Sequence, residues 1–83
     1  MAERLIGTVD HYFKDIGVAG VALSGYLKVG DRIHVQGHTT DFEQTVDSIE
    51  VEDEGLAEVA SGQSIGIKVP ERCRAGDHVF KLD

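Results

Sequence analysis

Apolar and polar residues alternate along most of this chain, with the two-residue period typical of β-strands. Within residues 32–36, Ile33 and Val35 share one face. A second run, at 64–69, alternates in the same way and ends at Pro70. No segment keeps a 3.6-residue period over three turns. The pattern therefore predicts an all-β protein.

Six strands are expected, separated by turns that contain glycine. They are predicted at residues 4–13, 17–23, 32–36, 42–51, 64–69 and 78–82. The apolar positions of 42–51 change parity, which indicates a β-bulge near Asp47 and Ser48. Residues 56–60 are interpreted as a short helical turn or an irregular loop. Strands of this number and length favour an antiparallel sandwich or barrel, and a small closed barrel is predicted because closure removes exposed strand edges.

Two Gly-Asp pairs mark turns that lead into strands. Gly30–Asp31 precedes the strand at 32–36, and Gly76–Asp77 repeats the arrangement near the end of the chain. Glycine adopts φ > 0 without steric cost, and an aspartate side chain can accept hydrogen bonds from nearby backbone amides. We expect both turns to serve the architecture and to have no catalytic or ligand-binding role.

Composition predicts a single domain over residues 1–83, with the barrel at about 4–82 and one small core. Cys73 is the one cysteine, so no internal disulfide is possible and a cytoplasmic protein is expected. Neither a signal peptide nor a membrane span of ~20 apolar residues is visible. The net charge of −7 disfavours RNA as a partner, since lysine and arginine drive binding to phosphates.

In their order along the chain, these motifs resemble the second domain of the translational GTPases, as in elongation factor Tu. The resemblance covers residues 5–82 and is carried by 17–21, 25–35, 46–49, 60–67 and 76–79. It implies a six-stranded Greek-key β-barrel of the translation-factor domain 2 type. It also implies a non-catalytic binding module that docks to a protein or an RNA and is connected with translation.

Two activities of those proteins, GTP hydrolysis and aminoacyl-tRNA binding, are not expected of this chain. No Gly-x-x-x-x-Gly-Lys-Ser/Thr motif occurs, so neither nucleotide binding nor GTPase activity is expected. Glu50 matches a glutamate of the aminoacyl pocket, but Asp53 and Ser64 stand where an arginine and an asparagine are needed. Glu50 is kept as a candidate binding residue, and aminoacyl-tRNA binding is not expected. Similar barrels are appended to U32-type peptidases, so a separately encoded accessory subunit of an enzyme is the alternative.

The other candidate contact residues lie near the end of the first strand and in a late loop. Tyr12 and Phe13 are adjacent on a strand, so their side chains face opposite sides and one is expected to be exposed. Exposed aromatics anchor protein interfaces or stack on bases. Lys14, with Arg72 and Arg74, completes the candidate site. A protein partner is favoured over RNA, and an aromatic that only plugs the barrel mouth is the competing interpretation.

No catalytic constellation is expected, and neither a cofactor nor a metal. The four histidines, which show no sign of converging on a metal, are expected at the surface: His11, His34, His38 and His78. Cys73 lies between Arg72 and Arg74, whose charges favour a lowered thiol pKa, although a half-buried thiol without a role is the preferred interpretation. The acidic run at 50–54 is either a solvated loop or an acidic face for a basic partner.

Overall fold

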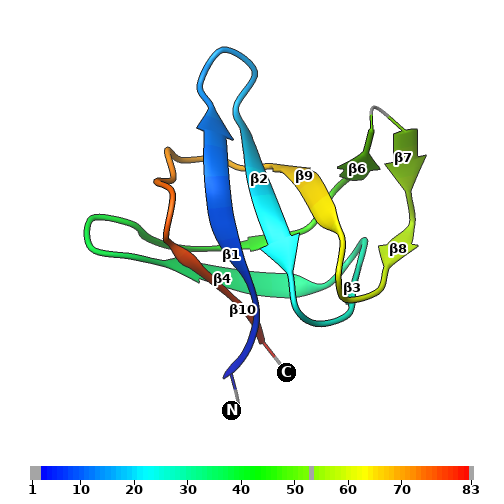
Figure 1. The fold of residues 1–83 in the computed structure, drawn as a ribbon. Helices are drawn as coiled ribbons and strands as arrows, with labels where there is room; N and C mark the ends of the chain where they lie inside the picture. The colour runs from blue at the N-terminus through cyan, green and yellow to red at the C-terminus, as the bar shows by residue number, and fades with distance from the viewer. Residues whose placement is uncertain (1–2, 53, 83) are drawn as a thin grey trace.

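Strands and turns make up the whole described part of the chain, residues 3–52 and 54–82 of a computed structural model (Figure 1). Every strand pair in it is antiparallel. The strands are β1 Glu3–Phe13, β2 Val18–Leu23, β3 Leu27–Lys28, β4 Arg32–Gln36, β5 Asp41–Thr45, β6 Ile49–Val51, β7 Glu54–Leu56, β8 Glu58–Val59, β9 Ser64–Lys68 and β10 His78–Leu82. The all-β antiparallel prediction is confirmed. Among these residues no helix is long and apolar enough to cross a membrane.

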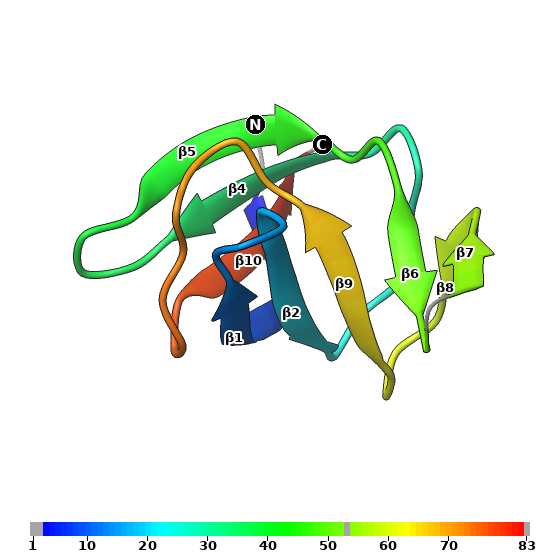
Figure 2. The same ribbon diagram turned by 90° about the horizontal axis from the view of Figure 1, so that it is seen from above.

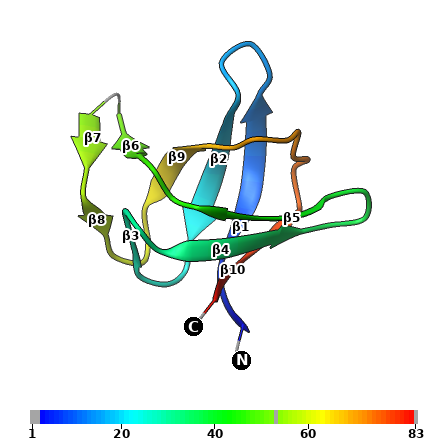
Figure 3. The ribbon, with the colours of Figure 1, turned by 180° about the vertical axis from the view of Figure 1, so that it is seen from behind.

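Eight strands form one sheet in the order β5-β4-β10-β1-β2-β9-β6-β7, and β3 pairs with β8. Figure 2 shows this sheet curling around an interior. The first and last strands pair, with Glu3 opposite Leu82, so the described chain begins and ends on the same side of the fold (Figures 1 and 3). Closure into a six-stranded Greek-key barrel is not confirmed, because no pairing in the described residues joins β5 back to β7.

The core follows the predicted alternation. Ile33 and Val35 of β4 are buried, as are Ile65 and Ile67 of β9. The buried apolar residues form one cluster, which consists of Ile6, Val9, Ala19, Val21, Leu23, Leu27, Ile33, Val35, Phe42, Val46, Ile49, Val59, Ile65, Ile67, Val69, Cys73 and Val79. Small and β-branched side chains dominate it, as expected for a tightly curled sheet with few aromatic residues.

Two expectations for the middle of the chain are wrong. The strand predicted at 42–51 is divided into β5 and β6, which pair with β4 and β9 respectively. The division occurs because Val46 turns to the β3–β4 connection: its N–H donates to the Asp31 carbonyl at 2.9 Å, and its own carbonyl accepts from the Gly30 N–H at 2.8 Å. The segment is therefore broken, and no bulge is needed.

Residues 56–60 do not form a helical turn or an irregular loop. Leu56 ends β7, and β8 follows at Glu58–Val59. Val59 pairs with Leu27 of β3, far away in the sequence, and both side chains are buried. This long-range pairing fixes a segment whose local pattern is too short to specify a strand.

The Gly-Asp turns are confirmed as strand-entry devices. Gly30 and Gly76 have nearly equal positive φ angles, 100° and 98°. In each turn the aspartate Oδ2 accepts a hydrogen bond from the amide three residues earlier, at 3.1 Å for Asp31 and 2.9 Å for Asp77. Each aspartate N–H also donates to the carbonyl of that earlier residue. The two turns therefore use the same local chemistry to start β4 and β10.

Candidate functional site

A row of glycines crosses the outer face of the curled sheet. Gly20 of β2 pairs with Gly66 of β9. Gly66 also pairs with Glu50 of β6, which pairs in turn with Gly55 of β7. Gly66 lies between the buried Ile65 and Ile67, so it belongs to the outer face. Because glycine has no side chain, the row leaves a depression in the sheet surface at Gly66. Glu50 interrupts the row, and the Asp10 carboxylate lies over Gly20, with Oδ1 2.7 Å from the place of a Cβ.

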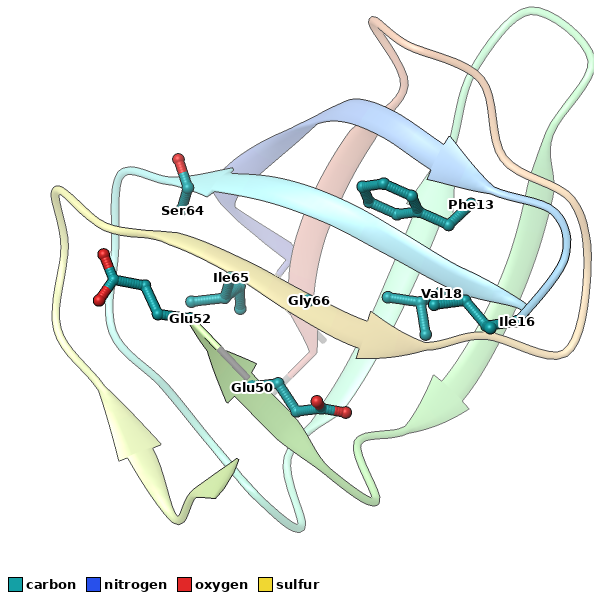
Figure 4. Close-up of a pocket in the computed structure, with 8 residues that line it drawn as sticks. All are labelled: Phe13, Ile16, Val18, Glu50, Glu52, Ser64, Ile65 and Gly66. Carbon is teal, nitrogen blue, oxygen red and sulfur yellow. The ribbon is translucent and has the colours of Figure 1, made fainter. Parts of the chain in front are cut away.

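A shallow pocket of about 370 Å³ lies over this depression (Figure 4). Its lining comes from three separate parts of the chain: Phe13, Ile16 and Val18 of the β1–β2 hairpin, residues 64–66 of β9, and Glu50 and Glu52 at the end of β6. In Figure 4, Gly66 lies between the Phe13 ring and Glu50. The pocket thus joins an apolar wall to an acidic rim across a floor of backbone.

The apolar wall is exposed but held in place. Phe13 is 46% exposed and Ile16 is 62% exposed. The Phe13 ring meets the His11 ring edge-on, with 4.4 Å between ring centroids. A Cβ on Gly20 would lie 3.6 Å from Phe13 Cε2, an ordinary contact distance, so the ring lies close over this glycine; the tighter approach there is Asp10 Oδ1, at 2.7 Å. Tyr12 packs partly against the core, and one aromatic of the pair is therefore exposed, as predicted.

The acidic rim has no partner within the described part of the chain. Glu50 and Glu52 are exposed, and neither carboxylate makes an ion pair or a hydrogen bond to another described residue. Glu52 adopts φ 51°, in the left-handed region, directly after β6. The two carboxylates give this end of the pocket a negative potential that attracts cations.

The structure brings together some of the sequence-predicted site residues. Phe13 and Glu50, 37 positions apart in the chain (50 − 13), line the same pocket. Tyr12 and Lys14 line a neighbouring hollow at the tip of the β1–β2 hairpin. Phe13 and Ile16 border both this hollow and the pocket.

Arg72 and Arg74 do not join this group. Both are exposed in the connection between β9 and β10, and neither borders the pocket or the hollow. The Arg74 backbone serves the Gly-Asp turn, where its N–H donates to Asp77 at 2.9 Å. Lys14, Arg72 and Arg74 therefore do not form a basic surface at the pocket.

Six of the eight lining residues were not predicted as site residues: Ile16, Val18, Glu52, Ser64, Ile65 and Gly66. Ile16 is an apolar residue in an otherwise polar turn, and Gly66 interrupts a strand at its centre; both are sequence signals for an exposed anchor and a depression. Val18 carries no signal of its own, because any strand can contain it. Glu52 belongs to the acidic run at 50–54; Asp53 of that run lies outside the described residues.

Cys73 is a structural thiol. The prediction that neighbouring arginines lower its pKa is wrong, as is the prediction that it is half-buried. The side chain is only 2% exposed, and burial raises the pKa of the thiol to about 11, with the negative charges of Asp77 and Glu71 adding to the effect. A thiol with such a pKa is almost entirely protonated at neutral pH and is a poor nucleophile.

His34 is not a free surface histidine. Its side chain is 12% exposed, and it lies between two carboxylates: Nδ1 is 2.8 Å from Glu3 Oε2, and Nε2 is 2.5 Å from Asp41 Oδ1. The hydrogen bond to Asp41 raises the pKa of His34, Glu3 adds to this, and burial opposes it. Within 3–52 and 54–82, no three His, Cys, Asp or Glu side chains form a group that could hold a metal.

Comparison with known proteins relates this chain to parts of larger proteases. It is 33% identical over 78 residues to an uncharacterized protease of Methanocaldococcus jannaschii, and 35% identical over 83 residues to a collagenase of Porphyromonas gingivalis. These matches cover 93% and 98% of this chain but only 19% and 23% of the relatives. The chain thus spans about a fifth of the length of the curated relatives it matches. No protein-family model matches it.

A solved structure decides the fold. The chain aligns with the C-terminal domain of a Geobacillus thermoleovorans protein assigned to the U32 peptidases, with a TM-score of 0.90, 23% identity, and coverage of 96% of this chain and 93% of that domain. A selenomethionine form of the same domain aligns with a TM-score of 0.87. This chain has the fold of that C-terminal domain.

The assignment to the second domain of elongation factor Tu is wrong, and so is the implied link to translation. The relatives are proteases, and the similar structures are U32 C-terminal domains. The motifs that carried the resemblance include the two Gly-Asp turns, whose hydrogen bonds and φ angles start strands. Such backbone-driven features occur wherever short strands must turn sharply, so they indicate a type of fold and not a family.

Proposed function

We propose that this chain is a non-catalytic accessory domain of a U32-type peptidase and that it binds polypeptide. The observation that carries the proposal is the similarity, over nearly the whole chain, to about a fifth of a protease and of a collagenase. The fold of a U32 C-terminal domain supports the same role. The pocket beside Phe13 offers a place where a polypeptide can bind.

The chemistry of the chain supports a binding role more than a catalytic one. The Cys73 thiol is buried and protonated at neutral pH, and the most enclosed histidine, His34, is already held by Glu3 and Asp41. Catalysis by either would need a nucleophile and a base within hydrogen-bonding reach. The acidic rim at Glu50 favours a protein partner over RNA, whose phosphates it would repel. A cytoplasmic location belongs to the same proposal.

Affinity capture tests the association with a peptidase. A tagged copy of the chain is expressed in its source organism, recovered under native conditions and analysed by quantitative mass spectrometry. We expect a U32-type catalytic region to be enriched, either in the same polypeptide or as a bound partner. Enrichment of a different class of enzyme, or of ribosomal proteins, would overturn the proposal.

A proteolysis assay tests the non-catalytic role. The purified chain alone is incubated with gelatin and casein, and we expect no release of peptides above a buffer blank. Addition of the chain to the captured catalytic region should lower the KM for a protein substrate more than it changes kcat, because a binding domain adds contacts that do not depend on the transition state. Peptide release that copurifies with the chain and persists without the catalytic region would refute this role.

A further inference from the structure

The pocket on the outer face combines two features that suit one kind of ligand. Phe13, Ile16 and Val18 form an apolar wall, and Glu50 and Glu52 form an acidic rim. A group that matches both has an aliphatic stem and a positively charged end. We propose that this pocket binds a lysine or arginine side chain presented by an extended polypeptide.

The wall suits the stem of such a side chain. Lysine and arginine bury their methylene groups on apolar surfaces while the charged end stays near polar groups. Phe13 and Ile16 expose 46% and 62% of their surface, so the apolar contact area is available. The His11 ring contacts Phe13 at 4.4 Å between centroids and helps to hold this aromatic in position.

The rim suits the charge. Neither Glu50 nor Glu52 forms an ion pair with a basic side chain of residues 3–52 and 54–82, so these residues leave the negative charge of the rim uncompensated. A basic side chain from a partner would supply the missing charge. Exposed ion pairs discriminate only modestly, and the selectivity should therefore be moderate.

The floor suits an extended segment. Gly66 pairs with Gly20 on one side and with Glu50 on the other, so the centre of the pocket consists of backbone. A Cβ at Gly66 would come within 3.2 Å of Val18 Cγ1, so even a methyl group would reduce the space. Glycine at such a position lets another backbone approach closely.

This inference rests on the proposed function in one respect, that the ligand is a polypeptide. The preference of the pocket for a basic side chain is argued from its geometry and charge alone. The test therefore needs no peptidase. The whole 83-residue chain is titrated with fluorescein-labelled nine-residue peptides that have one central residue between valines and serines. That residue is lysine, norleucine or glutamate. Binding is followed by fluorescence anisotropy, and the site is mapped by ¹⁵N chemical-shift changes.

We expect the lysine peptide to bind about threefold to tenfold more tightly than the norleucine peptide, as two exposed ion pairs allow. The glutamate peptide should bind most weakly. Glu50→Gln/Glu52→Gln should abolish the preference for lysine and leave norleucine binding unchanged. The control Asp47→Asn/Glu71→Gln changes net charge by the same amount at exposed sites outside the pocket, and it should keep the preference. Ile16→Ser should weaken the lysine and norleucine peptides equally.

Three outcomes would overturn the inference. These are equal binding of the lysine and norleucine peptides, an equal loss of preference in the control and in Glu50→Gln/Glu52→Gln, and shift changes that lie away from β9 and the β1–β2 hairpin. Circular dichroism confirms that each variant is folded, which is expected because every substituted side chain is exposed. If the lysine peptide is not preferred while a U32-type peptidase is still captured, the proposed function stands and this inference falls. If the lysine peptide is preferred but no such peptidase is captured, this inference stands and the proposed function falls.

Discussion

At the scale of single residues, Gly37 and Asp77 show how closely the chain is packed. Asp77 is 4% exposed, and its carboxylate accepts a hydrogen bond from the Arg74 amide at 2.9 Å. The Oδ1 atom of this carboxylate occupies the place where a Cβ on Gly37 would be. The carboxylate cannot move away without losing its hydrogen bond inside the fold. Gly37 therefore matters for space and not for a special backbone angle.

Gly37→Ala should lower the free energy of unfolding by about 1–3 kcal/mol, the usual cost of overpacking a filled site. Urea denaturation followed by circular dichroism measures the change. Gly55→Ala is the matched control, because no heavy atom lies within 4 Å of its Cβ position, and it should stay within about 0.5 kcal/mol of the parent. Equal losses in both variants would show that loss of glycine, and not the Asp77 contact, is responsible.

Cys73 provides a second test at this scale. Its folded-state pKa of about 11 lies above the ~8.5 of a free thiol, so folding favours the protonated form. The contribution of the protonated thiol to the free energy of unfolding is therefore complete below about pH 8.5 and declines as pH rises toward 11. The difference in free energy of unfolding between the parent and Cys73→Ala should therefore shrink between pH 8 and pH 10.

A thiol reagent tests the same burial directly. At pH 8, without denaturant, labelling of Cys73 by a chromogenic disulfide should be much slower than in urea above the unfolding midpoint. Rapid labelling of the native chain would contradict both the 2% exposure and the raised pKa.

At the scale of elements, His34 ties three strands together. It lies on β4, while its two carboxylate partners, Glu3 and Asp41, begin β1 and β5. These bonds raise the pKa of His34 above its ordinary value. Protonated His34 therefore stabilises the fold fully below pH 6.5, and this contribution is lost as pH rises through the folded-state pKa.

We expect the parent to lose more thermal stability than His34→Gln between pH 5.5 and pH 8. Melting temperatures measured by circular dichroism give this difference, and an NMR titration assigns the raised pKa to the His34 ring. His38→Gln, in the exposed β4–β5 connection, is the control and should follow the parent. A parallel pH response of the parent and His34→Gln would disprove a stabilising role for the three-strand contact.

The strands illustrate what the sequence could predict. Alternation alone placed β4 and β9, since Ile33, Val35, Ile65 and Ile67 must face the core. It could not place β8, because that strand exists through the pairing of Val59 with a residue 32 positions away, Leu27 (59 − 27). The break at Val46 was missed for the same reason: its backbone partners lie in another turn. Local patterns specify faces, while tertiary pairing specifies ends and breaks.

The sequence predicted only part of the candidate pocket, for a related reason. Phe13 stood out as an aromatic at a strand end, and Glu50 entered through a resemblance to a family that the relatives do not support. What unites them is the register that sets Gly20, Gly66 and Glu50 in one row across β2, β9 and β6. Register is set by how the whole sheet pairs, so this row could not be read from the sequence.

At the scale of the whole molecule, the two ends of the described chain are neighbours. Glu3 pairs with Leu82, and β10 lies between β1 and β4 in the sheet. The order of the strands along the chain could therefore change without any change in their contacts. Exposed loop tips tolerate new termini best, and the β1–β2 hairpin has one at Lys14 and Asp15.

A circular permutant tests whether fold and binding separate at this scale. Its original ends are joined by a short glycine-serine linker, and new ends are opened between Lys14 and Asp15. We expect circular dichroism and urea denaturation to show a folded sheet with cooperative unfolding. The lysine peptide should bind more weakly, because the opening lies between Phe13 and Ile16 and lets these two residues of the apolar wall move apart.

A second permutant, opened between the exposed Ala60 and Ser61, is the control. It keeps the β1–β2 hairpin intact and should retain both cooperative unfolding and binding of the lysine peptide. Undiminished peptide binding in the first permutant would mean that the hairpin does not form the binding wall, even if both permutants fold.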